Sequence, residues 1–174
     1  AYQALLDLDV DPKNITFAGD SAGAAHILAM AVYARNEGVP LPAGLVMISP
    51  FVDMTLTSES IQTKSKADPM LSVVPLQRGV QAYCAEELAA DPKVSPVFAE
   101  LEDLPPMFIQ VGSDEILLDD ALLLESRAKE AGVQVSCTVY PGMWHNFQMF
   151  SAFVEKADKA LWAIADFIRR GESQ

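Results

Sequence analysis

The chain has 174 residues, of which 12 are basic and 24 acidic, so its formal net charge at pH 7 is −12. Hydrophobic residues make up 51 % of the sequence, which excludes the intrinsically disordered class and suits one domain with a sizeable core. The acidic balance argues against nucleic acid or an anionic membrane surface as a partner. No apolar stretch of the sequence is long enough to span a bilayer. The expected location is cytoplasmic, with Cys84 and Cys137 as reduced thiols. A disulfide between these two cysteines is the less favoured alternative.

The first half of the chain alternates strand and helix signals. Residues 1–8 resemble the last turns of a helix, and residues 14–18 form a short apolar run typical of a strand. Residues 21–37 are apolar nearly all round, which predicts a helix buried on most faces. Gly38 is a candidate cap at the end of this helix. Residues 44–49 then form a continuous apolar run, which favours a parallel strand covered on both faces.

Residues 50–104 interrupt this alternation. Proline, serine, threonine and aspartate are frequent from residue 50 to residue 69, and a helix is predicted from Ser72 to about Ala90. We interpret the region as an insertion that sits over the sheet.

The alternation resumes in the last third of the chain. Strands are predicted at residues 107–111 and 134–140, and helices at residues 117–131 and 147–170. Strand alternating with helix four times predicts an α/β fold with a mostly parallel sheet flanked by helices.

The strand at 14–18 leads into Gly19-Asp20-Ser21-Ala22-Gly23, and a helix follows directly. A G-x-S-x-G pattern between a strand and a helix is typical of the nucleophile elbow of serine hydrolases, although the bare pattern alone is weak. Glycines on both sides of the serine are expected to avoid Cβ collisions in the sharp turn. Ser21 is therefore the predicted nucleophile.

Serine needs a base to remove its proton, and the chain has two histidines. His26 lies five positions after Ser21 in the same helix, a spacing that points its ring elsewhere, so we assign it to packing or solvent. His145 follows the strand 134–140 in a loop at the carboxyl edge of the sheet, where the elbow also lies. His145 is the predicted base; the alternative is a histidine that only contacts backbone at a helix N-terminus.

The third member must be a carboxylate between the serine and the histidine in chain order. Asp114 follows the strand 107–111 through Gly112 and Ser113, so it also reaches the carboxyl edge, and we predict it to orient the imidazole. Glu115, Asp119 and Asp120 are its competitors. The last two fall at a predicted helix N-terminus, where acidic residues are expected for electrostatic reasons alone.

Three motifs carry a resemblance to a known family: residues 19–23, residues 112–120, and Gly142-Met143-Trp144-His145. Together with Asp68-Pro69-Met70-Leu71-Ser72 and residues 94–96, they resemble the hormone-sensitive-lipase-like (family IV) carboxylesterases of the α/β-hydrolase superfamily. The resemblance covers essentially the whole chain. It implies core segments at residues 1–50 and 105–174, with a small helical cap at residues 51–104.

The resemblance also implies roles for residues and shows departures. It assigns the nucleophile to Ser21, the acid to Asp114, the base to His145 and one oxyanion-hole donor to the backbone N–H of Ala22. The family usually has a second glycine after the elbow and a glycine after the histidine, where this chain has Ala24 and Asn146. Its upstream His-Gly-Gly-Gly stretch does not occur in this sequence. We therefore expect a C-terminal part of a larger hydrolase, with N-terminal strands missing, an unpaired edge at the strand 14–18 and marginal stability alone.

The predicted function is that of a serine carboxylesterase or lipase that hydrolyses short- to medium-chain acyl esters through an acyl-enzyme, without cofactor or metal. Its activity is expected to need N-terminal residues outside this chain. Apolar residues near the loops are candidates for an acyl pocket, and core packing is an equally good interpretation of each: Phe51, Met54, Trp144, Phe147 and Met149.

Two alternatives remain open: a non-catalytic small-molecule binding module on the same fold, or an inactive fragment of an esterase. An amide or peptide substrate is not excluded either. The expected partners are a small-molecule ester, the N-terminal part of the same protein, and a second copy bound through residues 134–140 and 147–170, as the resemblance implies.

Overall fold

A computed structural model describes residues 1–171 of the chain. Four parallel strands form one sheet in the order β1-β2-β3-β4, with bounds Thr16–Asp20, Gly44–Ile48, Met107–Gly112 and Val135–Tyr140. The two central strands, β2 and β3, are nearly continuous in apolar residues, as expected for parallel strands with helices on both faces. The predicted α/β fold and all four predicted strands are confirmed.

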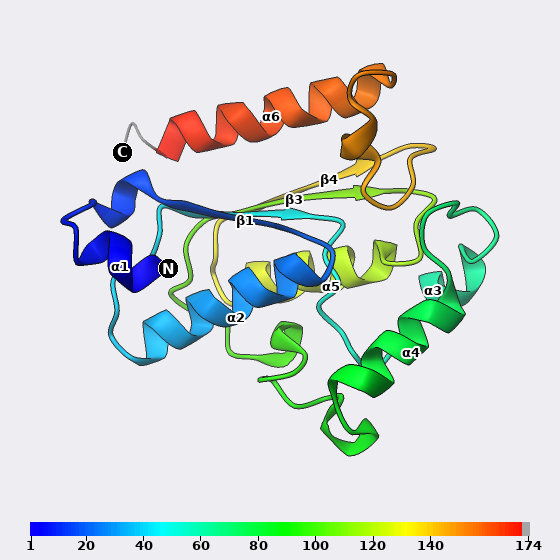
Figure 1. Cartoon of the computed structure of the whole chain (residues 1–174), viewed down its shortest axis with the longest axis horizontal. Coiled ribbons are helices and arrows are strands. Elements are labelled where there is room, and N and C mark those ends of the chain that lie inside the picture. Colours follow the sequence, from blue (N-terminus) through cyan, green and yellow to red (C-terminus); the bar gives the residue numbers. More distant parts are fainter. Residues whose placement is uncertain (172–174) are drawn as a thin grey trace.

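Helices cover both faces of the sheet (Figure 1). The helices α2 (Ala22–Asn36) and α5 (Leu118–Glu130) lie on one face, and α6 (Glu155–Gly171) lies on the other. Helix α2 has little amphipathic character and buries residues all round, including Ala24, Ile27 and Leu28. It ends before Gly38, which adopts a positive φ of 66° as a C-cap.

Residues 51–104 contain no strand. They form the helices α3 (Glu59–Thr63) and α4 (Val73–Tyr83) and short 3-10 turns, and α4 lies beyond α2 near the carboxyl ends of the strands (Figure 1). Leu76, Val80 and Val97 belong to the same hydrophobic core as the sheet. The segment is thus packed on the α2 and α5 layer; its description as a separate cap stays a prediction.

Two helix boundaries differ from the sequence expectation. Helix α4 ends at Tyr83, where Cys84 turns extended with φ −145° and ψ 158°, and a 3-10 turn, Glu86–Leu88, follows. The last helix begins at Glu155, eight residues later than predicted, because Asn146 is left-handed and Phe147–Phe150 form a 3-10 turn. The apolar spacing of residues 147–154 therefore reflects packing of a loop; Phe147 is fully buried there.

Within residues 1–171, β1 pairs only with β2, so the strand at the elbow is an edge strand, as predicted. The short helix α1 (Tyr2–Leu6) packs beside it through an edge-to-face contact between Tyr2 and Phe17. No helix in this described stretch combines the length and apolar character that a bilayer crossing requires.

Candidate active site

The serine lies on a strained turn between β1 and α2. Ser21 has φ 52° and ψ −123°, a conformation that non-glycine residues rarely adopt and that marks the nucleophile elbow. A Cβ atom on Gly19 would overlap the carbonyl of Gly23, so glycine is required there. A Cβ on Gly23 would meet only an Asp20 oxygen at 3.9 Å. The expectation of a steric need for glycine is therefore confirmed at Gly19 and wrong at Gly23.

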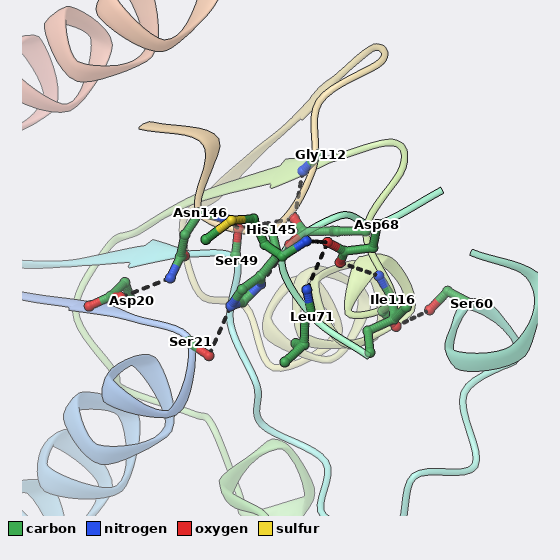
Figure 2. A network of polar contacts seen from close by, with 12 residues as sticks. Asp20, Ser21, Ser49, Ser60, Asp68, Leu71, Gly112, Ile116, His145 and Asn146 are labelled. Atoms are coloured by element: carbon green, nitrogen blue, oxygen red, sulfur yellow. Dashed lines mark hydrogen bonds and ion pairs between the residues drawn. The ribbon is translucent and has the colours of Figure 1, made fainter. Parts of the chain in front are cut away.

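His145 contacts the serine, as Figure 2 shows, and on its other side a buried carboxylate. Its Nε2 lies 3.1 Å from Ser21 Oγ, and its Nδ1 lies 2.9 Å from Glu115 Oε2. Because an ionised carboxylate can only accept, Nδ1–H donates to Glu115, which leaves Nε2 free to accept the serine proton. Only 6 % of His145 is exposed, so this pair is shielded from water.

The carboxylate beside His145 is Glu115, and the expectation for Asp114 is corrected. Asp114 donates its backbone N–H to Met143 O at 2.9 Å, which turns its side chain outward. That side chain is 42 % exposed and lies 3.9 Å from Lys64 Nζ. Glu115 is fully buried and points to the imidazole. A one-residue choice of this kind depends on the exact path of the turn after β3, which spacing along the chain does not fix.

Glu115 accepts three hydrogen bonds. One comes from Gly112 at the end of β3, and the other two come from Ser49 and His145, which follow other strands at the same sheet edge. Oε1 accepts from Gly112 N at 2.6 Å and from Ser49 Oγ at 3.0 Å, in addition to the Oε2 contact with His145. Ser49 Oγ in turn accepts from Asn146 N at 3.1 Å. The fully buried Ser49 thus joins the end of β2 to the acid and to the histidine loop, a role that its place after an apolar run did not reveal.

The loop that carries His145 packs tightly against the end of β3. A Cβ on Gly112 would overlap the carbonyl of Met143, so glycine at 112 lets the two segments touch. Asn146 adopts the left-handed region, with φ 54° and ψ 34°, which explains how it replaces the glycine that the resemblance leads us to expect. Its Nδ2 donates to Asp20 Oδ2 at 2.9 Å, which links the histidine loop to the elbow.

Asp68 ties the 51–104 segment to the acid loop (Figure 2). One of its oxygens accepts from Met70 N at 2.9 Å and Leu71 N at 3.1 Å, and the other accepts from Ile116 N at 3.2 Å. The motif at residues 68–72 is therefore a structural clamp beside Glu115.

Asp119 and Asp120 make a second set of links between the same segments. Asp119 Oδ2 accepts from Ser60 N at 2.7 Å. Asp120 Oδ2 accepts from Val52 N and Asp53 N, both at 3.0 Å, and its Oδ1 accepts from Ser58 Oγ at 3.1 Å. Both carboxylates do more than complement the helix dipole, which was the sequence expectation. Burial raises the pKa of Asp120 to about 7, with a smaller contribution from the nearby Asp53 charge and opposition from these hydrogen bonds.

Asp120→Asn is expected to flatten part of the pH dependence of folding. The folded-state pKa of Asp120, about 7, lies above the unfolded value of about 4, so its stabilising contribution is full below pH 4 and is lost as the pH rises to 7. A shift of this size corresponds to at most about 4 kcal/mol. Between pH 4 and pH 8 the wild type should lose up to that much more unfolding free energy than the variant, as measured by urea unfolding. Parallel pH curves for the two proteins would contradict the assignment.

The five candidate pocket residues separate into two groups. Phe51 and Met54 line a cavity that opens beside Ser21. Trp144, Phe147 and Met149 do not line it, because the segments on both sides of His145 lie on the α6 face of the sheet. There Phe147 packs with Ala157 and Ala160. The ring centroids of Trp144 and Phe150 are 5.7 Å apart, and Met149 is mostly exposed. For these three residues the pocket expectation was wrong.

His26 and the cysteines behave as non-catalytic groups. His26 Nδ1 lies 2.9 Å from Ala22 O, and its exposed ring borders the cavity beside Ser21. Cys84 and Cys137 are unpaired, and burial raises the pKa of the Cys137 thiol to about 12. In the part of the chain that the structure describes, no group of three or more His, Cys, Asp or Glu side chains is arranged to hold a metal ion.

Comparison with known proteins agrees with this geometry. The family described as "alpha/beta hydrolase fold" matches residues 1–149. An "Esterase" of Acinetobacter venetianus is 45 % identical over 167 residues, which cover 95 % of this chain and 55 % of that protein. An "Acetyl-hydrolase" of Streptomyces hygroscopicus is 36 % identical, with coverage of 97 % and 56 %. The chain thus spans little more than half the length of these relatives.

Solved structures give the same result. EstE5, whose crystal was soaked with p-nitrophenyl butyrate, superposes with a TM-score of 0.95 at 37 % identity. The match covers 100 % of this chain and 58 % of the EstE5 chain. An esterase from the bacterial hormone-sensitive lipase family superposes with a TM-score of 0.95 at 38 % identity, with coverage of 99 % and 58 %. The chain belongs to the α/β-hydrolase fold family, within the group of hormone-sensitive-lipase-like esterases.

Proposed function

We propose that the protein containing this chain is a serine carboxylesterase that acts on small-molecule acyl esters. The observation that carries the proposal is the continuous line from Ser21 Oγ through His145 to Glu115, with contacts of 3.1 and 2.9 Å. The names of the relatives, esterase and acetyl-hydrolase, support it.

In the proposed reaction, Ser21 Oγ attacks the ester carbonyl while His145 Nε2 takes the hydroxyl proton. Glu115, which accepts from Nδ1–H, stabilises the imidazolium that forms. The N–H of Ala22, the first residue of α2, donates to the oxyanion, since the first N–H groups of a helix have no partner within the helix. His145 then protonates the leaving alcohol, and water repeats the sequence on the acyl-enzyme.

A single N–H donor would stabilise the oxyanion only weakly, because each oxyanion-hole donor typically contributes about 10²–10³ to the rate. We propose that residues outside this chain supply further donors. The proposal is therefore tested on the chain together with the residues that flank it in its natural reading frame. Hydrolysis of p-nitrophenyl butyrate that disappears in Ser21→Ala supports an esterase; hydrolysis independent of Ser21 refutes it, and saturable binding without turnover favours the binding-module alternative.

We also propose that the protein forms a homodimer through β4 and α6 and that it is located in the cytoplasm. Within residues 1–171, β4 pairs only with β3, and Val139 of β4 and Trp162 of α6 are 38 % and 58 % exposed, which supports a contact through these elements. Val139→Asp is expected to convert a dimer into a monomer in light scattering, and an unchanged mass would contradict this interface. Recovery of the native protein in a secreted or membrane fraction would contradict the location.

A further inference from the structure

A cavity of about 340 Å³ runs between α2 and α4 and begins at Ser21. Small side chains of α2 form one wall, and α4 forms the other with Pro75, Gly79 and Tyr83. The small residues on the α2 side are Ala22, Ala25 and Ala29. The cavity is mostly apolar, so it suits a hydrocarbon chain.

The position of the cavity favours the acyl part of an ester over its alcohol part. His145 must protonate the leaving alcohol, so the alcohol lies on the histidine side of Ser21. Among the described residues, none of the histidine loop at 142–149 lines the cavity. The substituent that enters between α2 and α4 is therefore the acyl chain, on the opposite side of the carbonyl.

The length of the cavity indicates a medium-length chain. From Ala22 to Ala29, α2 advances by about 10 Å along its axis. An extended hydrocarbon advances by about 1.3 Å per C–C bond, so this wall accommodates an acyl chain of roughly eight carbon atoms.

Gly79 lines this cavity from the interior of α4. A glycine in a helix interior destabilises the helix relative to alanine. Neither a positive φ nor a neighbouring atom requires glycine here, because a Cβ built at this position meets no atom within 4 Å. Gly79 is exposed and lines the cavity, so a side chain at this position would enter open space beside the cavity wall.

We propose that Gly79 keeps the α2–α4 cavity open to linear acyl chains of about six to eight carbon atoms and so determines the acyl-length preference of the enzyme. The inference rests on the proposed esterase function. Each methylene that enters the cavity contributes roughly fourfold to kcat/KM, so wild-type kcat/KM should rise from acetate to octanoate.

The test is the kcat/KM series for p-nitrophenyl acetate, butyrate, hexanoate, octanoate and decanoate, with Gly79→Ala, Gly79→Leu and Gly79→Phe. The ratio of octanoate to acetate kcat/KM is expected to fall about thirtyfold or more in Gly79→Phe, less in Gly79→Leu, and to change little in Gly79→Ala. Gln81→Phe is the matched control, because Gln81 is exposed on the same helix and does not line the cavity. It should leave the ratio unchanged.

Three results would overturn the inference: an unchanged ratio in Gly79→Phe, an equal fall in Gln81→Phe, or an effect confined to the alcohol chain in a series of ethyl, butyl and octyl acetates. Because the readout is a ratio between two substrates of one preparation, partial misfolding does not imitate the expected result. If the wild type shows no Ser21-dependent hydrolysis, the proposed function fails; if it hydrolyses esters but Gly79 variants keep its profile, only this inference fails.

Discussion

Replacement of Glu115 by glutamine is expected to lower kcat by about 10³–10⁴, because the imidazolium of His145 loses its carboxylate partner and the tautomer of the ring is no longer enforced. Replacement of Asp114 by asparagine should change kcat by less than about threefold, since its exposed side chain does not contact His145. Steady-state hydrolysis of p-nitrophenyl butyrate by the two variants measures the difference.

The two variants are matched controls for each other, because both remove one negative charge from neighbouring residues of the same turn. Thermal unfolding should show that each is folded. A large loss in Asp114→Asn with near-normal activity in Glu115→Gln would restore Asp114 as the acid and contradict the hydrogen bond between Glu115 and His145.

Ser21→Ala is expected to reduce kcat by about 10⁴–10⁶, because the acyl-enzyme can no longer form. The three residues should act as one unit. In the Ser21→Ala background, His145→Ala and Glu115→Gln are expected to cause little further loss, whereas each alone causes a large one. Additive losses on a logarithmic scale would show that the residues do not share one chemical step.

The strands and the elbow could be predicted from the sequence because their signals are local. Short apolar runs at residues 44–49 and 107–111 have few interpretations other than buried parallel strands, and parallel strands bring their carboxyl ends to one edge. Ser21 and His145 follow the parallel strands predicted at residues 14–18 and 134–140. Their meeting, at 3.1 Å in the structure, could therefore be anticipated from chain order alone.

The acid could be placed only to within one residue. Asp114 and Glu115 are adjacent and both are carboxylates, so the choice depends on which of them the turn after Gly112 directs inward. A signal was present in the sequence: Glu115 directly precedes the apolar pair Ile116 and Leu117, both fully buried, whereas Asp114 follows two small turn residues. Burial of the neighbours favours the longer side chain as the one that faces the core.

Other parts of the site were inaccessible to sequence analysis because they depend on contacts between distant segments. The hydrogen bonds of Ser49 to Glu115 and of Asp68 to Ile116 join residues 66 and 48 positions apart. The helical spacing after Phe147 gave the wrong prediction because a loop that packs apolar side chains beneath α6 imitates helical periodicity over a few residues. The left-handed conformation of Asn146, directly before this 3-10 turn, has no reliable sequence signal.

The central claim, that Ser21 forms a covalent acyl-enzyme, is tested most directly by mass spectrometry after reaction with a fluorophosphonate. The chain, expressed with its natural flanking residues, should gain the mass of one phosphonyl group, and peptide mapping should place that group on Ser21. Ser21→Ala should gain none, and prior incubation with an ester substrate should slow the labelling. Labelling at another residue, or equal labelling of Ser21→Ala, would contradict the account.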